Sequence, residues 1–582
     1  MPRSTYVLGI NAAYHESAAC LLRDGELLFA LEEERFTRVR HAKRPHPFSA
    51  WELPFHAIEH CLTRENITLS DVAAVAYSFQ PYVRLGYMLP RAVRQLPRYG
   101  LEPFSRELRL FGDIRNAPRL LASGAPWHLL RPFLSIHPRA LYRFRWLPHH
   151  LCHAASAFFV SPFDEAAVLS VDGVGERSCT WLGMGRGTTL QRLYSCNYPN
   201  SLGFLYEEVT RYLGFQRNND EYKVMALAAL GSPTYRNTFS SLVQFLPRGR
   251  IHVQIDFDRP CVIAARELTD AFGPPRMFGE PLSEPHADIA ASLQVTLEEA
   301  LLHITRFARE ATGADFLCLA GGVALNCVAN TRIAKESGFR DIFIQPAAND
   351  AGTALGAALL VGMREHGWPP ARPWGHCYYG DAYSNDDIFK VLVGSGLRFE
   401  LVADPAAVGA RLLGEERIIG WFQGRAEFGP RALGNRSILA SPLCRGTVER
   451  VNHIKGREQF RPLAPAVLLE HVADFFEDGA ALPYMLQVRR VRPDRRQGIP
   501  AVAHCDGTAR VQTVSEQVNP LFHRLIACFA RVRGVPIVLN TSFNGPGEPI
   551  VRTPAEALAT LMRTPLDALI IGEYLVTKNG TR

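Results

Sequence analysis

Short apolar runs separated by turn residues open the chain, and a similar set recurs further along it. The predicted strands are Tyr6–Ile10, Ala18–Arg23 and Glu26–Leu31 in the first set, and Ala167–Val171 and Thr180–Gly183 in the second. Asp24-Gly25 is a two-residue hairpin signal in the first set, and 172–175 is a Gly-containing turn in the second. Two such hairpin units predict an internally duplicated α/β fold.

Further patterns extend this duplicated domain over residues 1–366. They predict the helix Ile289–Thr312, the strands Phe316–Ala320 and Asp341–Gln345, and the small-residue helix Gly352–Val361. Residues 367–375 contain three Pro and predict a linker. Residues 376–582 predict a second α/β domain, with strands near Arg417–Trp421 and Pro536–Asn540 and a final helix–strand pair from Pro554. An Arg- and aromatic-rich helical insertion, about 80–147, interrupts the first domain.

Composition narrows the protein class. Apolar residues make up 47% and charged residues 21% of the 582 residues, which excludes a disordered or fibrous protein. No apolar run has the 18 or so residues of a membrane span, and no secretory signal is expected at the start. The twelve Cys form no CxxC pair and are expected to be reduced thiols. A cytoplasmic location follows as an expectation.

The net charge of +7 is concentrated in the insertion. Twelve Arg stand against three acidic residues between Arg84 and Arg145, a local balance of +9. Because the basicity is regional, it is poor evidence for general nucleic-acid binding. We favour a surface helical layer with Arg stems over apolar faces, and a lid over an acceptor substrate is the alternative. Only six of the 64 basic residues are Lys, so each Lys is of interest.

A candidate metal site begins with His149 and His153. The segment 150–160 has helical character, so these two His, four residues apart, share a helix face that suits two ligands of one ion. Asp350, between a strand end and a helix start, is the candidate third ligand. The alternatives are capping or exposed His at a helix N-terminus, and an Asp350 that only caps its helix.

Two Gly-containing turns suggest a phosphate or nucleoside site. Asp172-Gly173 follows an apolar strand, and Gly321-Gly322 ends another strand where Asn326 and a helix follow. Glycines there let the backbone approach a ligand, although ordinary turns are the alternative. His15, between two predicted strands, is a candidate general base for a hydroxyl group, with a plain loop His as the alternative.

The second domain carries a series of cations among flexible backbone. Residues 424–437 hold Arg425, Arg431 and Arg436 among Gly, and further cations and polar residues follow at Lys455, Arg457, Arg461, His504, Asp506, Arg510, Gln512, Asn540 and Ser542. Guanidinium forks, an ammonium and backbone N–H groups suit a bound phosphate. A solvated basic face is disfavoured because these cations lie among Gly, Pro and Phe.

Taken together, these residues resemble the O-carbamoyltransferases of antibiotic and nodulation-factor biosynthesis over nearly the full length. The matching stretches are Gly9–Ala19, Glu32–Arg38, His149–Phe158, Glu221–Met225, Gly321–Asn326, Pro346–Gly352, Gly429–Ser437 and Asn540–Asn544. Their order and spacing are more specific than any one motif. The resemblance implies an actin-like first domain and a second domain similar to the enzyme that makes threonylcarbamoyl-adenylate.

The resemblance also implies the chemistry and its residues. Carbamoyl phosphate is broken down to carbamate in the second domain, and carbamate attacks the α-phosphate of ATP in the first. An acceptor hydroxyl then attacks the carbamoyl-adenylate, with His15 as its base or positioner and Lys455 also assigned a catalytic role. The implied ligand sets are His149, His153 and Asp350 for an iron-type divalent metal, Asp172, Gly173, Lys223, Gly321, Gly322 and Asn326 for the nucleotide, and Lys455, Arg461, Arg510, Asn540 and Ser542 for carbamoyl phosphate. Mg²⁺ is a further candidate cofactor.

Two departures from the family pattern limit the resemblance. Glu16 replaces an Asp found in many members, and the region 80–147 contains no recognised motif. The expected partner is a small-molecule hydroxyl acceptor, with no nucleic acid and no membrane, and its identity stays open, as do the metal and the oligomeric state, a homodimer included. Competing interpretations are an actin-like sugar kinase, a tRNA-modifying fusion enzyme and a non-enzymatic nucleotide-binding scaffold.

Overall fold

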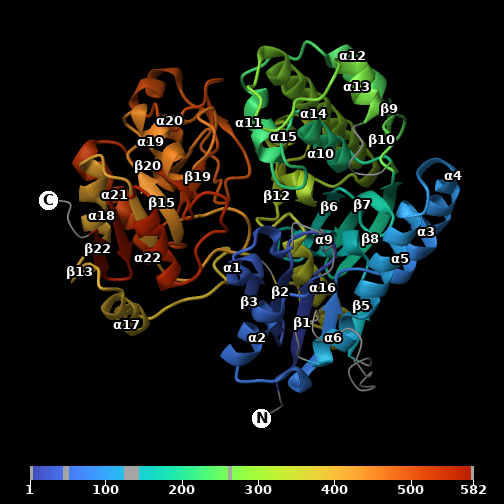
Figure 1. The fold of residues 1–582 in the computed structure, drawn as a ribbon. Helices are drawn as coiled ribbons and strands as arrows, with labels where there is room; N and C mark the ends of the chain where they lie inside the picture. Colours follow the sequence, from blue (N-terminus) through green and yellow to red (C-terminus); the bar gives the residue numbers. More distant parts are fainter. Residues whose placement is uncertain (1–3, 44–51, 124–142, 260–264, 372, 579–582) are drawn as a thin grey trace. The chain divides into compact units, whose positions relative to one another are not determined.

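The chain forms two compact units. The structure is a computed structural model that describes residues 4–43, 52–123, 143–259, 265–371 and 373–578 (Figure 1). Unit 1 comprises Met1–Thr37 with His41–Trp374, and unit 2 comprises Arg38–Arg40 with Gly375–Arg582. The predicted linker 367–375 therefore contains the second boundary, whereas the assignment of 38–40 to unit 2 was not expected from the sequence.

Unit 1 contains two five-stranded sheets with the same topology. The first has the order β3-β2-β1-β4-β5, and the second, read in the same direction, has β8-β7-β6-β11-β12. In each sheet the first three strands in the chain are antiparallel and the two later strands add in parallel. The predicted duplication is confirmed, and this repeated order is that of an actin-like domain. The strands are β1 Tyr6–Asn11, β2 Ala18–Arg23, β3 Glu26–Glu32, β4 Val72–Tyr77, β5 Phe144–Trp146, β6 Glu165–Val171, β7 Ser178–Arg186, β8 Thr189–Asn197, β11 Phe316–Ala320 and β12 Asp341–Ile344.

Helices α9 (His149–Phe158) and α16 (Ala351–His366) form the centre of unit 1 (Figure 1). Helix α16 packs on β1 and β2, α9 packs on β6 and β11, and the two helices pack on each other. Small residues make this close approach feasible. A Cβ on Gly356 of α16 would lie 1.8 Å from the carbonyl oxygen of Cys152 on α9.

Gly356→Ala is therefore expected to destabilise the protein. The added methyl must push α16 away from α9, and overpacking of this kind costs about 1–3 kcal/mol. The measurement is the midpoint of thermal unfolding. Gly86→Ala is the matched control, because Gly86 lies in helix α3 with open space around its Cβ position, and alanine there should stabilise slightly. Equal midpoints for the two variants would contradict the close packing.

The remaining elements of unit 1 surround this centre. Helix α3 packs on α5 in the insertion, where the buried Arg84 pairs with the buried Glu107 at 3.1 Å. The insertion is helical over 81–123, as predicted, whereas residues 124–142 lie outside the described part of the chain, and its role as a surface layer or a lid stays a prediction. These elements are α1 Glu34–Thr37, η1 Arg40–Ala42, α2 Phe55–Arg64, η2 Leu69–Asp71, α3 Pro81–Arg94, α4 Leu96–Tyr99, α5 Glu102–Arg115, α6 Ala117–Ser123, α10 Leu202–Tyr212, α11 Glu221–Ala228, α12 Arg236–Leu242, β9 Val243–Leu246, β10 Arg250–Val253, α13 Arg266–Phe272, α14 Glu284–Thr312, η3 Gly322–Leu325 and α15 Cys327–Glu336.

Unit 2 is a mixed eight-stranded sheet in the order β13-β22-β21-β14-β15-β20-β16-β19, buried on both faces. Strand β21 shows the alternation: Ala568 and Ile570 join one core, and Leu569 and Ile571 join the other. The second α/β domain is confirmed. Its elements are α17 Asn385–Ser395, β13 Arg398–Leu401, α18 Pro405–Gly414, β14 Ile419–Phe422, β15 Arg436–Ala440, α19 Gly446–Ile454, β16 Ala464–Leu468, η4 Leu469–His471, α20 Val472–Phe475, β17 Arg489–Arg490, η5 Pro493–Gly498, β18 Thr508–Ala509, β19 Gln512–Val514, α21 Pro520–Arg533, β20 Ile537–Ser542, α22 Pro554–Arg563, β21 Ala568–Ile571 and β22 Tyr574–Thr577.

Across the described ranges, no helix combines the length and the apolar character needed to cross a membrane.

Candidate functional site

The two predicted His ligands and Asp350 meet in unit 1, and Asp172 joins them. The Nε2 atoms of His149 and His153 each lie 3.4 Å from Asp350 Oδ1. They lie 3.4 Å and 3.7 Å, respectively, from Asp172 Oδ2. One ligand atom from each of the four residues lies within 4.8 Å of the others. The sequence interpretation assigned Asp172 to the nucleotide alone, so its place among these four residues is new.

The fold fixes the direction of each group in this cluster. His149 begins α9, where its backbone N–H donates to Glu176 at 2.9 Å, and its Nδ1 lies 3.2 Å from the carbonyl oxygen of Ser78. That contact leaves Nε2 facing the carboxylates. Asp350 occupies the N-cap position of α16 but its side chain makes no capping hydrogen bond. The capping-only alternative for Asp350 is therefore wrong, because its carboxylate points to the two His instead.

Electrostatics favour the charged form of the cluster. Burial by itself lowers the pKa of His149, yet Asp350 and Asp172 raise it well above its usual value. Burial raises the pKa of Asp172, but the two His hold it well below its usual value. Two carboxylates thus remain ionised in a buried site, which demands compensating positive charge.

The residues of the cluster fit a divalent metal ion. The Nδ1 atom of the buried His153 has no hydrogen-bond partner within the described part of the chain, and its Nε2 faces the two carboxylates. Two imidazoles and two carboxylates form a donor set suited to Fe²⁺ and similar first-row ions.

His15 lies in the β1–β2 loop and is linked to this cluster by a polar chain. Asn11 Nδ2 donates to the carbonyl oxygen of His15 at 2.7 Å, and Asn11 Oδ1 accepts from Ser78, whose carbonyl contacts His149. The flanking Tyr14 and Glu16 have φ of 59° and 38°. Strained non-Gly backbone on both sides of one His is typical of a functional loop. Burial lowers the pKa of His15, so the imidazole is neutral near neutral pH.

Two further residues beside His15 were missed by the sequence interpretation. His41 Nδ1 lies 3.1 Å from Glu16 Oε1, and its Nε2 lies 3.1 Å from Asn219 Oδ1. Lys43 is buried and donates to the carbonyl oxygen of Ala12 at 2.8 Å, and burial lowers its pKa to about 7. The scarcity of Lys in the chain was the signal for Lys43, whereas nothing local distinguished His41.

The predicted nucleotide residues are partly assembled. The backbone N–H of Gly322 donates to Asp172 Oδ1 at 3.2 Å, which joins the Gly321-Gly322 turn to the metal cluster. Gly321 has φ of 89°, and a Cβ there would lie 2.1 Å from the carbonyl oxygen of Val171, so glycine is required. Asn326 caps α15 by accepting from the Ala329 N–H.

Gly173 and Lys223 flank this region in different ways. Gly173 follows Asp172 directly, and a Cβ there would lie 3.0 Å from the Phe204 ring. Lys223 in α11 pairs with Asp220 at 3.2 Å, and its Nζ lies 5.7 Å from the centre of the Phe215 ring. The nucleotide role of Gly173 and Lys223 stays a prediction.

In unit 2, Lys455 is held by the end of β20 and the residues that follow it. It follows α19 and is almost fully buried, with Nζ donating to Ser542 Oγ at 3.0 Å and to the Asn544 carbonyl at 3.2 Å. Nζ also donates to the Ser542 carbonyl and to Asn544 Oδ1. Burial lowers the pKa of Lys455 well below its usual value, and Arg457 and Arg461 lower it further.

Asn540 and Ser542 lie on the same face of β20, two residues apart. Asn540 Nδ2 donates to Gln512 Oε1 at 2.7 Å and to the Ala432 carbonyl at 3.2 Å. These contacts fix the amide, and its Oδ1 is buried and accepts no hydrogen bond from any described residue. A buried, oriented and unsatisfied acceptor two residues before Ser542, which contacts Lys455, indicates a ligand that carries N–H groups.

The Gly- and Arg-rich segment 424–437 proved structural in part. Arg436 is fully buried and donates to the Asp381 carbonyl at 3.0 Å, with its guanidinium 3.7 Å from the Phe422 ring centre. Arg425 donates to the carbonyls of Gly380 and Tyr379. The prediction that all three Arg of this segment suit a phosphate is therefore wrong for Arg425 and Arg436, because backbone carbonyls already occupy their forks.

Arg461 and Arg510 have less specific surroundings. Arg461 lies 3.7 Å from Glu458 and contributes positive charge beside Lys455. Arg510 precedes β19 and lowers the pKa of the buried His504, after the larger effect of burial itself. Their assignment to carbamoyl phosphate stays a prediction.

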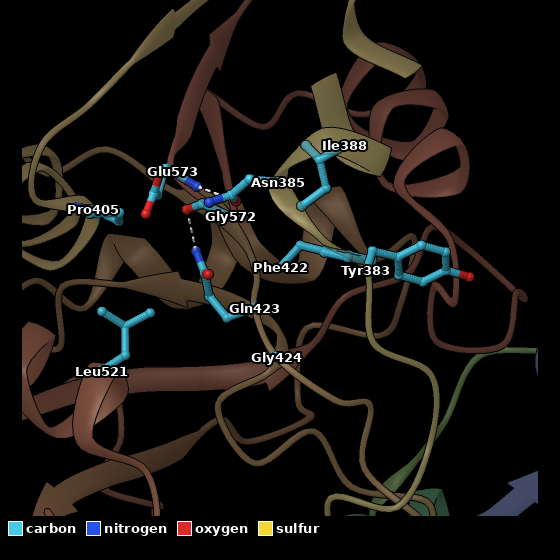
Figure 2. Close-up of a pocket in the computed structure, with 10 residues that line it drawn as sticks. All are labelled: Tyr383, Asn385, Ile388, Pro405, Phe422, Gln423, Gly424, Leu521, Gly572 and Glu573. Atoms are coloured by element: carbon cyan, nitrogen blue, oxygen red, sulfur yellow. Dashed lines mark hydrogen bonds between the residues drawn. The ribbon is translucent and has the colours of Figure 1, made fainter. Parts of the chain in front are cut away.

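Unit 2 also has a pocket of about 330 Å³ at the C-terminal end of β14 (Figure 2). Gln423 Nε2 donates to the Gly572 carbonyl at 3.0 Å across its wall, and Phe422 and Leu521 supply apolar surface. The predicted carbamoyl phosphate residues are not among its lining residues in the described chain. We therefore assign no ligand to this pocket.

Comparison with known families gives two matches that together span both units. The family model described as carbamoyltransferase N-terminus matches residues 6–359. The model described as carbamoyltransferase C-terminus matches residues 410–578.

Named relatives agree with these matches. The nodulation protein NolNO of Sinorhizobium fredii is 38% identical over 98% of this chain and 80% of its own length. The nodulation protein NolO of Bradyrhizobium diazoefficiens is 42% identical over 74% of this chain and 78% of its own. The 3'-hydroxymethylcephem-O-carbamoyltransferase of Amycolatopsis lactamdurans is 33% identical over 62% of this chain and 65% of its own.

Proposed function

We propose, starting from the fact that the chain belongs to the carbamoyltransferase family, that it makes carbamoyl-adenylate and transfers the carbamoyl group to a small-molecule hydroxyl. Water first splits carbamoyl phosphate into carbamate and phosphate. A carbamate oxygen then bonds to the α-phosphorus of ATP as the bond to the β-phosphate oxygen breaks and pyrophosphate leaves. The acceptor oxygen finally attacks the carbamoyl carbon, AMP leaves, and the hydroxyl proton passes to a base.

One pair of observations supports the first step most directly: the buried Lys455 contacts Ser542, and the unsatisfied Oδ1 belongs to Asn540, two residues before Ser542 on β20. A phosphate dianion would compensate the Lys455 ammonium, and the carbamoyl NH₂ would donate to Asn540. Ser542, which already contacts Lys455 at 3.0 Å, adds a hydroxyl that can serve the same ligand. This pairing of one cation with one N–H acceptor suits carbamoyl phosphate better than inorganic phosphate.

In unit 1, the residues near Asp172 suit adenylate formation. The Gly321-Gly322 turn brings backbone within reach of a ligand, and the Gly322 N–H already donates to Asp172. His15, with its pKa lowered by burial, is neutral and able to take the proton of an acceptor hydroxyl. The polar chain through Asn11 holds the His15 loop relative to the cluster.

His149, His153, Asp172 and Asp350 would hold the divalent metal. When bound, such an ion offsets the negative charge that builds on the phosphates during nucleotide transfer. Fe²⁺ is our proposal for its identity from the family resemblance, with Mg²⁺ as a further co-substrate ion for ATP. The ionised state of the two carboxylates is consistent with this role.

The acceptor is proposed to be a natural product of low molecular weight. One relative is named for a cephem that carries a hydroxymethyl group, and others are nodulation proteins. The common chemistry is an alcohol on a small molecule. The contacts described around His15 do not distinguish among such alcohols, so an acceptor screen follows the test of the activation steps.

The decisive assay measures pyrophosphate and AMP released from ATP without any acceptor. We expect release only when carbamoyl phosphate is present, because carbamate is the nucleophile. The matched control omits carbamoyl phosphate and supplies phosphate instead. Isotope from labelled carbamoyl phosphate should appear in an adenylate that ion-exchange chromatography separates from ATP.

Other products would contradict the proposal. ADP as the nucleotide product would indicate a kinase, and pyrophosphate release that ignores carbamoyl phosphate would indicate another adenylating enzyme. A requirement for threonine, bicarbonate and tRNA would indicate the tRNA-modifying alternative. Metal-loaded, folded protein that is silent with every acceptor of the screen would favour the scaffold.

A further inference from the structure

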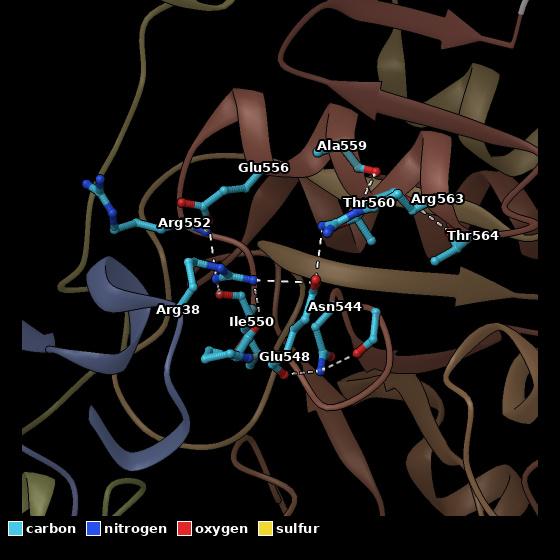
Figure 3. Close-up of polar contacts among 12 residues, drawn as sticks. Arg38, Asn544, Glu548, Ile550, Arg552, Glu556, Ala559, Thr560, Arg563 and Thr564 are labelled. Atoms are coloured by element: carbon cyan, nitrogen blue, oxygen red, sulfur yellow. Dashed lines mark hydrogen bonds and ion pairs between the residues drawn. The ribbon is translucent and has the colours of Figure 1, made fainter. Parts of the chain in front are cut away.

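Arg38 belongs to unit 2 although it lies in the first tenth of the chain. The guanidinium donates to two successive carbonyls, Ile550 at 2.7 Å and Pro549 at 2.8 Å (Figure 3). It also pairs with Glu556 at 3.2 Å and with Glu548 at 3.8 Å. One side chain thus contacts four oxygens of unit 2 through the two terminal nitrogens of its guanidinium.

The carbonyls that Arg38 contacts belong to the same loop as Asn544, which accepts a hydrogen bond from Lys455. Asn544 Nδ2 donates to the Glu548 carbonyl at 2.6 Å, and the Val551 N–H donates to the Phe543 carbonyl at 2.9 Å. These bonds close residues 543–551 into one loop. Asn544, near the start of the loop, accepts from Lys455, and Ile550, near its end, accepts from Arg38. Figure 3 shows Arg38, Asn544, Glu548 and Ile550.

The backbone conformation of Arg38 also supports a specific role for its contacts with unit 2. Arg38 has φ of 59°, a left-handed conformation that costs a non-Gly residue about 1–3 kcal/mol unless the surroundings impose it. An exposed loop under no constraint would avoid that conformation. The four contacts to unit 2 are the constraint visible in the structure.

We propose that Arg38 is a positioning residue of the carbamoyl phosphate site. It fixes the loop 543–551 so that Asn544, together with Ser542 at the end of β20, holds the Lys455 ammonium in its binding position. The identity of the ligand, carbamoyl phosphate, rests on the proposed function, which this inference deepens. The coupling of Arg38 to Lys455 rests on the contacts alone. A segment from the N-terminal part of the sequence therefore completes a site in the C-terminal part.

The kinetic test compares Arg38→Ala and Arg38→Lys with wild type in the full-length protein. We expect the KM for carbamoyl phosphate to rise about tenfold in Arg38→Ala, which corresponds to about 1.4 kcal/mol. The KM for ATP should stay within about twofold, because no ATP group is proposed in this loop. Arg38→Lys should recover only part of the loss, since one ammonium cannot serve both carbonyls and both carboxylates.

Arg563→Ala is the matched control. Arg563 pairs with the same Glu548 at 3.0 Å, but its side chain is 61% exposed and it does not bind the carbonyls of 549 and 550. Removing it takes one ion pair from Glu548 and leaves the contacts of Arg38 in place. We expect its KM values to match wild type, because an exposed pair contributes little.

A chemical readout tests the coupling without turnover. Acetic anhydride acetylates neutral, accessible amines, and mass spectrometry measures each Lys separately. In Arg38→Ala the residues that accept from Lys455 are held less firmly, so the Lys455 amine becomes more accessible. The ratio of acetylation at Lys455 to acetylation at the exposed Lys390 should therefore rise about fivefold, which corresponds to about 1 kcal/mol. The ratio should be unchanged in Arg563→Ala.

These readouts separate the two hypotheses. An unchanged acetylation ratio in both Arg38 variants overturns the positioning role, whatever the substrate is. A raised ratio without a change in the KM for carbamoyl phosphate keeps the coupling and contradicts the proposed function. If Arg38→Ala does not fold, Arg38→Lys decides by the same two measurements, and wild-type values there overturn the inference.

Discussion

Lys455→Ala is expected to lower carbamoyl-phosphate-dependent release of pyrophosphate by about 10³-fold, the rate equivalent of about 4 kcal/mol. The ammonium is buried, so no solvent cation can replace it beside a bound phosphate. Its loss also leaves Ser542 and Asn544 without their shared donor. The measurement is kcat/KM for carbamoyl phosphate from phosphate release and from pyrophosphate release. Lys390→Ala, on the exposed side of α17, is the control and should retain wild-type kinetics.

The same site should show a characteristic pH dependence. Burial and the nearby Arg457, Arg461 and Arg40 lower the pKa of Lys455, and a bound phosphate dianion raises it again. Binding therefore takes up a proton once the pH exceeds the pKa of the free enzyme, so the affinity for carbamoyl phosphate should fall as the pH rises. In Lys455→Arg, whose side chain stays protonated, this fall should disappear. A wild-type affinity that is independent of pH would contradict the buried-cation site.

Asp172→Ala is expected to cost at least about 100-fold in metal affinity, by comparison with the 10–100-fold cost of losing a residue that only supports a ligand. Its carboxylate lies 3.4 Å and 3.7 Å from the Nε2 atoms of His149 and His153. Metal content after dialysis, measured by inductively coupled plasma mass spectrometry, reports this loss directly. Asp350→Ala should lose metal equally, and pyrophosphate release should fall in parallel in both variants.

His150→Gln provides the control within the same helix. His150 is buried beside the cluster but is not one of its four residues, so metal content should be preserved. Asp172→Ala protein that keeps its metal and shows only a raised KM for ATP would restore the sequence interpretation of Asp172 as a nucleotide residue. Equal metal loss in His150→Gln would indicate that any substitution in α9 disrupts the site.

Local geometry explains what could be predicted from the sequence. Residues four apart on a helix share a face, and residues two apart on a strand share a face. The pair His149 with His153 follows from the helical period alone, whereas Asn540 and Ser542 are assigned through the family resemblance. Hairpin signals and apolar runs likewise predicted the duplicated sheets, with strand ends correct to within a few residues. Such features can be predicted because they depend only on the local order of residues in the sequence.

Side-chain direction and long-range pairing could not be predicted in this way. Asp350 has the sequence position of a helix cap, yet its carboxylate turns toward two His from another helix. Asp172 sits in a turn that suits a nucleotide, yet packing brings it to the same His pair. Arg436 lies in a Gly- and Arg-rich segment that suggested a phosphate site, yet its guanidinium donates to backbone carbonyls. In each case the partner is far away in the sequence.

The amino-acid sequence by itself determined the α/β class, the two domains' secondary structure, the carbamoyltransferase resemblance and the residue types available for chemistry, because these depend on local periodicity and on motif order. The tertiary structure alone decided which groups meet: Asp172 with the His pair, Lys455 with the Ser542–Asn544 loop, and Arg38 with unit 2. The reason is physical. Burial removes competing water, so an unsatisfied charge or acceptor must find its partner wherever the fold places one, at any distance along the chain.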